Sequence, residues 1–330
     1  MEPAIEPVRQ ACEAMGTRFE IVLPVGSEAE RARLVAAGEA ALDEVRVWHR
    51  RLSFFEASSF LSHVNRHAAA AAVACEAEFF ELLRLCRDAW RRTDGAFDPA
   101  IAGLMRAGGF RGAARDEEAL KRAARRGGFA RVEIDETART VRFGEVGAGG
   151  AAEVALDFGA IGKGWALDRA GEVLREAGVR AALLHGGTSS VLAMGTPGNG
   201  EDDDAWVVGL AGAAGGESSG PDVVARLRDG ALGTSSPSGR EVVDEAGRAH
   251  GHVIDPRTGD SARAARLAAV ACPSAAWADA WSTALLVDPG LAERMPGGWE
   301  CAMAEDEAPG WRVWGGGRVI ARPPTFRGGG

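Results

Sequence analysis

The fold class is decided by one segment, residues 154–184, which reads VALDFGAIGKGWALDRAGEVLREAGVRAALL. Its first part, Val154–Phe158, predicts a strand, and Gly159–Gly164 predicts a tight loop. Apolar residues recur at helical spacing over Trp165–Ala177, and Gly178 follows as a typical helix-ending glycine. A second strand is predicted over Ala181–Leu184. The segment therefore predicts a strand, a glycine-rich loop, a helix and a strand in succession.

Further elements are predicted on both sides of this unit. They are a strand over Arg18–Pro24, a helix from the cap residue Ser27 to about Leu52, a helix over Glu76–Thr93, a hairpin within Arg131–Phe143, strands over Val253–Pro256 and Ala268–Cys272, and a helix from the cap residue Ser274 to about Val287. Asp98 is expected to cap a helix that has Pro99 at its first position. Gly195–Gly220 is expected to be a surface excursion. Strands and helices alternate without a repeat period, which predicts an α/β or α+β fold.

Composition narrows the function classes. The chain has 330 residues and a formal net charge of -9, with only a modest basic cluster around Lys121–Arg126, so we expect no nucleic-acid partner. That cluster alternates with apolar residues and is interpreted as a solvated helix face. No stretch of about 18 apolar residues occurs, so no membrane span is expected. The five widely spaced cysteines are interpreted as buried, reduced thiols. The first residues lack a charged and then apolar signal pattern, so the chain as written is expected to be cytoplasmic, or exported if its true N-terminus is missing.

The loop Asp157–Gly164 is a candidate anion site. Its three glycines allow a ligand to approach the backbone closely near a helix N-terminus, and Lys163 adds a cation. The order of its residues matches neither a Walker A loop nor a dinucleotide-binding fingerprint. A purely structural turn between a strand and a helix explains the loop equally well.

A candidate metal site lies on the last predicted helix. Asp279 and Thr283 are four residues apart, so both side chains project oxygens from one helix face. A carboxylate, a hydroxyl and one or two backbone carbonyls form the oxygen set that Mg²⁺ prefers. The alternative is a threonine bonded back to its own helix beside a solvated aspartate.

A candidate base is His252, which precedes Asp255-Pro256-Arg257-Thr258-Gly259, a typical turn sequence. A histidine that is hydrogen-bonded in the core is the alternative.

Taken in order, these segments resemble the ApbE family, the FAD:protein FMN transferases. The resemblance extends from Met15 to about Phe326, and each of its segments is weak on its own. The segments are Met15-Gly16-Thr17, Leu52-Ser53-Phe54-Phe55 with Ser59 and Asn65 downstream, Gly95-Ala96-Phe97-Asp98-Pro99, Asp157–Gly164, the helix beginning Trp165-Ala166-Leu167-Asp168-Arg169, His252–Gly259, and Ala278-Asp279-Ala280 with Thr283.

The resemblance implies a set of site residues. Positions that hold FAD in the family are matched here by Met15, Phe55, Ala96, Phe97, Asp98, Asp157, Lys163 and Ile254. The Mg²⁺ ligands are matched by Ala160, through its backbone oxygen, and by the side chains of Asp279 and Thr283. His252 is the candidate general base by its family position. Phe55 and Phe97 are expected to contact a ring of FAD.

The resemblance also implies a fold and a reaction. The fold is an ApbE-type α/β (α+β) arrangement of two interleaved T-fold-like halves. A Thr or Ser hydroxyl of an acceptor flavoprotein, within an Asp-x-x-Ser/Thr-Gly-Ala-Ser/Thr type motif, attacks the FAD pyrophosphate, so that FMN is transferred and AMP leaves. Such a transfer needs positioning and charge neutralisation, for which Mg²⁺ and Lys163 are suited. We expect an N-terminal extension over residues 1–14, a single domain over 15–326 and a tail over 327–330.

Two departures from the family pattern affect the acceptor and nucleotide contacts. Thr188-Ser189-Ser190 follow His185-Gly186-Gly187, where the family usually has an Asp or Asn, and Thr234–Gly239 replaces a shorter Thr-Ser-Gly. Two alternatives to transfer therefore stay open. One is an enzyme that hydrolyses FAD to FMN and AMP, and the other is an FAD-binding protein without turnover.

Overall fold

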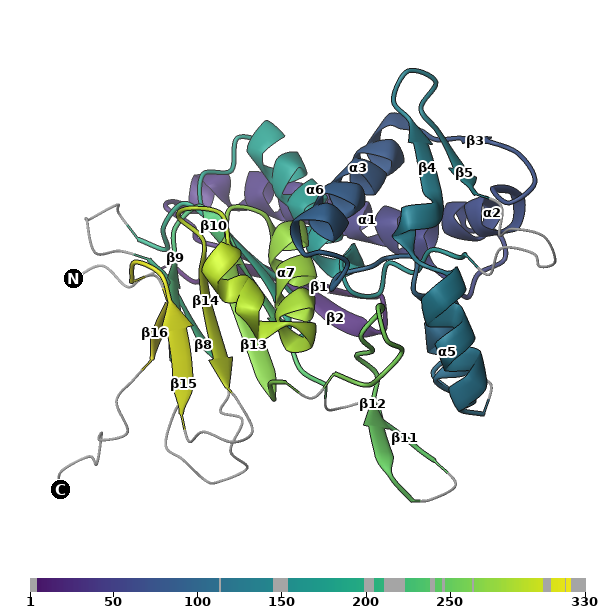
Figure 1. Ribbon diagram of the computed structural model, residues 1–330. Coiled ribbons are helices and arrows are strands. Elements are labelled where there is room, and N and C mark those ends of the chain that lie inside the picture. Colours follow the sequence, from purple (N-terminus) through teal and green to yellow (C-terminus); the bar gives the residue numbers. More distant parts are fainter. Residues whose placement is uncertain are drawn as a thin grey trace.

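The computed structural model describes residues 5–112, 114–144, 154–198, 205–210, 223–237, 241–244, 247–262, 264–304, 310–317 and 319–321. Its largest sheet has eight strands in the order β1-β2-β6-β7-β10-β13-β14-β15, and all of its neighbouring strands are antiparallel (Figure 1). The bounds of these strands are β1 Val8–Ala14, β2 Thr17–Leu23, β6 Ala182–Gly186, β7 Ser190–Met194, β10 Gly230–Ser235, β13 Leu267–Cys272, β14 Glu300–Ala304 and β15 Trp311–Trp314. The mixed helix and sheet class is confirmed, and the antiparallel pairing makes it α+β.

Three smaller sheets, seven α-helices and three short 3₁₀-helices (Glu28–Glu30, Phe129–Arg131 and Pro289–Arg294) complete the regular structure of the described residues. The smaller sheets are β16 (Val319–Ala321), β9 (Val223–Leu227) and β8 (Trp206–Leu210), then β3 (Val73–Ala74), β5 (Thr140–Phe143) and β4 (Val132–Asp135), and the hairpin β11 (Glu241–Val243) with β12 (Ala249–Gly251). The helices are α1 Arg31–Leu52, α2 Phe60–His67, α3 Ala77–Arg92, α4 Ala102–Ala107, α5 Glu117–Arg126, α6 Gly162–Glu176 and α7 Ala275–Val287.

The two faces of the main sheet are covered differently. Helices α1, α6 and α7 pack on one face, and the small sheet β16-β9-β8 packs on the other. Successive residues of a strand alternate between the two sides, as the pleat requires. On β10, for example, Ala231 belongs to the core on the helix side and Leu232 to the core under the small sheet.

The glycine-rich segment differs from its prediction in two ways. Residues 154–158 form no strand, because the main-chain groups of Leu156 bond to the Asn65 side chain and the Asp157 amide donates to the Pro99 carbonyl at 2.7 Å. The helix begins at Gly162, three residues before the predicted start. The second strand, β6, is confirmed.

Helix α7 forms as its sequence predicts. Ser274 is its N-cap, and the side chain of Ser274 accepts a hydrogen bond from the Trp277 amide. Two glycines allow close packing around this helix. A Cβ on Gly164 of α6 would lie 2.2 Å from the Ala275 carbonyl oxygen, and one on Gly233 of β10 would lie 2.4 Å from the Ala278 carbonyl carbon. Only glycine fits at either contact without displacing α7.

Other expectations need correction. Asp98 caps no helix, since its carboxylate accepts hydrogen bonds from the amides of Ala100 and Phe129, and α4 begins only at Ala102. The predicted strand Val253–Pro256 is a single bridge between Ile254 and Ser261. Within Gly195–Gly220, residues 206–210 form β8, and residues 199–204 and 211–220 lie outside the described residues.

The chain ends also bear on the predicted domain limits. Residues 8–14, assigned to an N-terminal extension, form β1 and pair with β2 along their whole length. The predicted tail, 327–330, lies outside the described residues.

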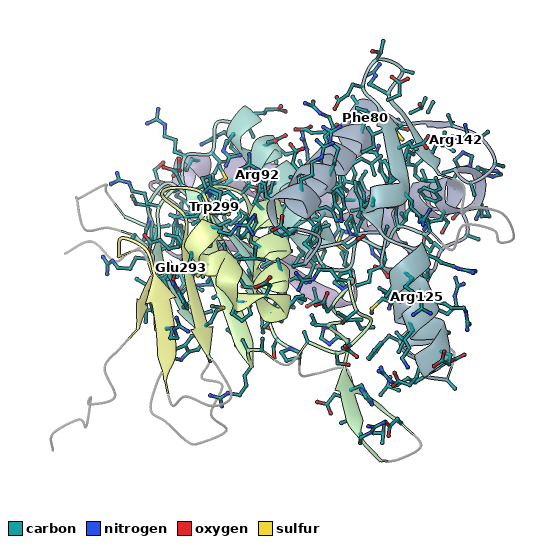
Figure 2. All side chains as sticks on the ribbon, viewed as in Figure 1. Phe80, Arg92, Arg125, Arg142, Glu293 and Trp299 are labelled. Carbon is teal, nitrogen blue, oxygen red and sulfur yellow. The ribbon has the colours of Figure 1, made fainter. Side chains whose placement is uncertain are left out.

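Two predictions from composition are confirmed. The basic cluster lies on the exposed side of α5, where Figure 2 labels Arg125. All five cysteines are free and buried. Among the helices of the described ranges, none is long and apolar enough to cross a membrane.

Candidate functional site

One cavity of about 1240 Å³ collects every residue predicted for the site. Its lining includes Met15, Phe55, Ala96, Phe97, Asp98, Asp157, Ala160, Lys163, His252, Ile254, Asp279 and Thr283. These residues come from the β1–β2 turn, the segment after α1, the segment after α3, the loop before α6, the first turn of α6, the loop after β12, and α7. The sequence prediction is therefore right that these distant segments meet. The role of each residue stays a prediction.

Asp279 lines the cavity together with Ser235 and Thr283, and we call this part of the cavity the polar end. Its side chain is 4 % exposed, and its carboxylate accepts hydrogen bonds from the Gly164 amide at 2.8 Å and from the Ser190 hydroxyl at 2.8 Å. Burial raises the pKa of Asp279 to about 6, against the lowering influence of the Lys163 charge and of these two hydrogen bonds. The solvated aspartate of the alternative interpretation is wrong.

Thr283 and Ser282 add hydroxyl oxygens one turn further along α7. Both hydroxyls donate to the Asp279 carbonyl, each at 3.0 Å, so the predicted bond of Thr283 back to its own helix is present. The Ser235 hydroxyl lies 3.2 Å from the Thr283 hydroxyl and 2.8 Å from that of Ser282. A hydroxyl that donates backwards keeps its lone pairs for a cation, so Thr283 remains a possible ligand.

Asp168 of α6 fixes the position of α7. Its carboxylate accepts hydrogen bonds from the Ser274 hydroxyl at 2.7 Å and from the amides of Ala275 at 2.8 Å and Ala276 at 3.0 Å. Three otherwise unpaired donors at the start of α7 are thereby satisfied by a residue of α6. These hydrogen bonds consequently fix the position of Asp279 relative to the glycine-rich loop.

Lys163 and Ala160 lie on the loop side of the same cavity. Lys163 is half-buried and forms no ion pair with any residue in the described ranges. Its positive charge acts to lower the pKa of Asp279. Ala160 is in the turn that leads into α6. The N-terminal amides of α6 lie next to this turn, and such a helix end favours an anion.

Asp157 is held by Arg111, a residue that the sequence did not single out. The guanidinium of Arg111 forms an ion pair with the Asp157 carboxylate, which also accepts the Gly159 amide at 2.9 Å. The same guanidinium lies 5.3 Å from the ring centres of Phe54 and Phe55. Phe55 is 78 % exposed, so its ring is open to a flat ligand, whereas Phe97 is 1 % exposed and belongs to the core.

Met15 occupies the tight turn between β1 and β2. Met15 has φ 51° and Gly16 has φ 72°, the positive pair that a two-residue hairpin turn of type I′ requires. Positive φ is costly for a methionine, and the His49 ring nitrogen accepts the Met15 amide at 3.1 Å. The turn thus presents Met15 to the cavity.

A family model described as the ApbE family matches residues 15–296. The chain belongs to the ApbE family.

Named relatives agree with this membership. An FAD:protein FMN transferase of Rhodobacter capsulatus is 31 % identical over 217 residues, which is 63 % of this chain and 38 % of that protein. One from Treponema pallidum is 29 % identical over 273 residues, 77 % of this chain and 73 % of that protein. The crystal structure of an ApbE protein from Thermotoga maritima superposes with a TM-score of 0.79 at 24 % identity, over 94 % of this chain and 97 % of that one. This last likeness confirms the ApbE-type fold.

The departures from the ApbE pattern lie against the predicted metal site. Ser190, in the first unusual segment, donates to Asp279, and Ser235, in the second, contacts Thr283. Residues 238–240 lie outside the described structure. Three residues of the site were not predicted from the sequence: Arg111, His49, which binds the Met15 amide, and Gly233, which packs on α7. No local sequence pattern indicates any of the three.

The residues present fit a Mg²⁺ ion. Among the described residues, no cluster of three or more His, Cys, Asp or Glu forms a metal site, so a cation here would depend on one carboxylate with hydroxyl, carbonyl and substrate oxygens. In the part of the chain that the structure describes, the Asp279 carboxylate accepts hydrogen bonds only from neutral donors, and Lys163 is the nearby positive charge that acts on it. A buried carboxylate in this setting favours the binding of a cation.

Asp98 gives a pH-dependent prediction. Burial raises its pKa to about 6 from the ordinary value of 3.8, against the hydrogen bonds from Phe129 and Ala100. Between about pH 4 and 6 the folded protein therefore holds a proton that the unfolded chain has released, so the stability falls as pH rises through this window. In Asp98→Asn we expect this fall, measured by urea unfolding at pH 4 and 6.5, to be smaller by about 2 kcal/mol. The exposed Asp43→Asn is the control, and an unchanged fall in Asp98→Asn would contradict the assignment.

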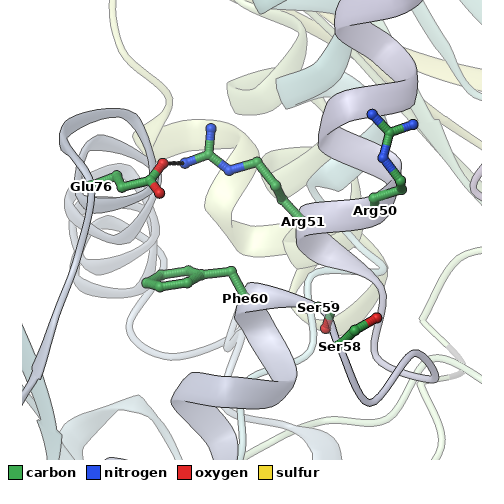
Figure 3. Close-up of a pocket in the computed structure, with 6 residues that line it drawn as sticks. All are labelled: Arg50, Arg51, Ser58, Ser59, Phe60 and Glu76. Carbon is green, nitrogen blue, oxygen red and sulfur yellow. Dashed lines mark hydrogen bonds and ion pairs between the residues drawn. The ribbon is translucent and has the colours of Figure 1, made fainter.

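A second, shallower hollow of about 320 Å³ lies between α1, α2 and the start of α3 (Figure 3). None of the predicted site residues lines it, and Arg51 is paired there with Glu76 and Glu78. We assign it no role.

Proposed function

We propose that this chain transfers FMN from FAD to a Ser or Thr hydroxyl of an acceptor flavoprotein, in a reaction that depends on Mg²⁺ and releases AMP. The hydroxyl oxygen forms a new bond to the phosphorus of the FMN half, and the pyrophosphate bond to AMP breaks. The acceptor is expected to carry an Asp-x-x-Ser/Thr-Gly-Ala-Ser/Thr type motif. The named relatives support the transferase activity.

The observation that carries the proposal is the convergence of the twelve predicted residues on one cavity with Asp279 buried in its wall. A diphosphate placed between the α6 N-terminus and α7 would meet backbone amides, Lys163 and the oxygens of Asp279 and Thr283. Phosphoryl transfer depends mainly on such positioning and charge neutralisation.

Asp279, Thr283 and the Ala160 carbonyl would hold the metal, and a bound Mg²⁺ would supply charge neutralisation to the phosphates. Lys163 stabilises the negative charge that develops on the leaving phosphate. The hydrogen bonds of Asp168 and Gly164 fix the Asp279 carboxylate relative to the glycine-rich loop, so that these groups need to move little during the reaction.

The test uses the full chain, FAD and Mg²⁺ with a synthetic peptide that carries the motif. We expect mass spectrometry to find the peptide heavier by FMN less water, with one AMP released per labelled peptide, and both products to disappear with excess EDTA. AMP and free FMN without labelled peptide would favour hydrolysis instead. FAD binding without AMP would favour a protein that only binds the flavin.

His252 is proposed as the general base that removes the proton of the acceptor hydroxyl. It is half-buried and lines the cavity that holds Asp279. In His252→Ala we expect kcat to fall by about 10²- to 10⁴-fold while FAD affinity is retained. The measurement is the initial rate of peptide labelling, with His63→Ala on α2, which does not line the cavity, as control. An unchanged kcat in His252→Ala would show that His252 is not the general base.

A further inference from the structure

The cavity continues beyond the predicted FAD and metal residues onto the opposite face of the main sheet. There it is lined by Leu183 and His185 of β6, Val191 of β7, and Leu232 and Thr234 of β10. These side chains face away from α7, because the residues that alternate with them face the helices. Ser190 bonds to Asp279, and Gly233 packs on the backbone of α7. We call this part of the cavity the apolar arm, and it contains none of the twelve predicted site residues.

The apolar arm and the polar end are joined at the strand ends. Thr234 lines the cavity on the arm side, and Ser235, the next residue, contacts Ser282 and Thr283 of α7. Ser189 also lines the cavity here. A chain that lies in the arm can therefore reach the predicted metal site without crossing the sheet.

Strand β8 borders the apolar arm, and the residues that it contributes indicate that its backbone edge faces the cavity. Four consecutive residues, Val207, Val208, Gly209 and Leu210, line the cavity. A strand that presents one face contributes only every second residue, as β6 and β10 do along the arm. Several consecutive residues of a strand line a cavity when the edge of that strand, and not one of its faces, borders the cavity.

The edge of β8 is preformed. β8 pairs with β9 on one side, and no other strand of the described structure pairs with it. Both of its ends are anchored in the core under the small sheet, where Trp206 is 8 % and Leu210 is 6 % exposed. Between them Val207 is 58 % exposed, an apolar side chain beside the cavity. Such an edge is a template for an added strand.

We propose that the acceptor protein binds in the apolar arm as an extended segment that pairs with the edge of β8. This inference rests on the proposed transferase function, since that function requires a protein chain to enter this cavity. The five residues of β8 offer roughly 17 Å of edge, enough for main-chain pairing along about five acceptor residues. The acceptor hydroxyl would then be delivered past Thr234 to the polar end.

The test is an N-methyl scan of the motif peptide with the full-length protein, FAD and Mg²⁺. Each N-methyl group removes one backbone donor, and only alternate amides of an added strand face β8. We expect the KM for the peptide to rise about 3- to 10-fold at every second position near the motif, with the KM for FAD unchanged. A flat profile, or an equal effect at all positions, would overturn the pairing.

A substitution in the enzyme tests the same pairing. Val207→Asp places a charge beside the proposed strand, and we expect about a tenfold rise in the KM for the peptide. Val313→Asp on β15, where Val313 is 37 % exposed and outside the cavity, is the matched control and should keep both KM values. If Val207→Asp raised the KM for FAD instead, the arm would hold the flavin and the proposal would be wrong. If the unmodified peptide were never labelled, the proposed function itself would fail.

Discussion

Asp279→Asn is expected to reduce Mg²⁺-dependent FMN transfer by about a thousandfold or more, which corresponds to about 4 kcal/mol of transition-state stabilisation. The amide keeps the shape of the side chain but carries no charge for a cation, and Asp279 is the only carboxylate in the proposed ligand set. The rate of peptide labelling at saturating FAD and Mg²⁺ measures the effect.

The same variant is expected to be folded. Burial opposes the charge of Asp279, as its raised pKa indicates, so removing the charge relieves a cost at neutral pH. We therefore expect a Tm, measured without Mg²⁺, no lower than that of the wild type. Asp43→Asn, an exposed carboxylate on α1, is the control and should transfer FMN normally. FMN transfer by Asp279→Asn at the wild-type rate would contradict the assignment of Asp279 as a metal ligand.

Gly164→Ala is expected to damage both the fold and the site. The added Cβ would lie 2.2 Å from the Ala275 oxygen and 2.6 Å from the Ala276 nitrogen, and the amides of both residues donate hydrogen bonds to Asp168. Helix α7 must shift, so we expect a loss of about 1–3 kcal/mol in the free energy of unfolding. A shift of α7 also separates the Gly164 amide from Asp279, and a displacement of about 1 Å can reduce turnover about 10²-fold.

Urea unfolding and the initial transfer rate are the measurements for this variant. Gly297→Ala is the matched control, because a Cβ at Gly297 would meet no atom within 4 Å. A stable Gly164→Ala protein with the wild-type rate would mean that the contact between α6 and α7 does not position the site.

The sequence predicted best those features that depend on neighbouring residues. The cap and course of α7 were predicted because Ser274 acts on an amide three residues away and because apolar residues fill the rest of the helix. The relation of Asp279 to Thr283 was predictable for the same reason, since helix geometry fixes it.

Features set by tertiary contacts escaped the sequence. The segment 154–158 has strand-like residues, but the Asn65 side chain, 91 residues away in the sequence, forms hydrogen bonds with the main-chain groups of Leu156. The links from Arg111 to Asp157 and from Ser190 to Asp279 join residues 46 and 89 apart. Strand β8 was missed because its flanks are rich in Gly, Asp and Glu, which indicate loops.

The family resemblance was needed to bring the separate motifs into one site. Asp157, His252 and Asp279 each have a plain structural interpretation when taken alone. Their convergence on one cavity depends on how α6, α7 and the loop after β12 pack together. No periodicity or spacing in the chain encodes that arrangement.

The most direct measurement is the anomalous scattering of Mn²⁺, in place of Mg²⁺, in crystals of the full chain grown with FAD. We predict one strong peak within about 2.5 Å of the Asp279 carboxylate, the Thr283 hydroxyl and the Ala160 carbonyl, with the FAD phosphates completing the coordination. A peak elsewhere in the cavity, or bound FAD with no metal beside Asp279, would contradict it.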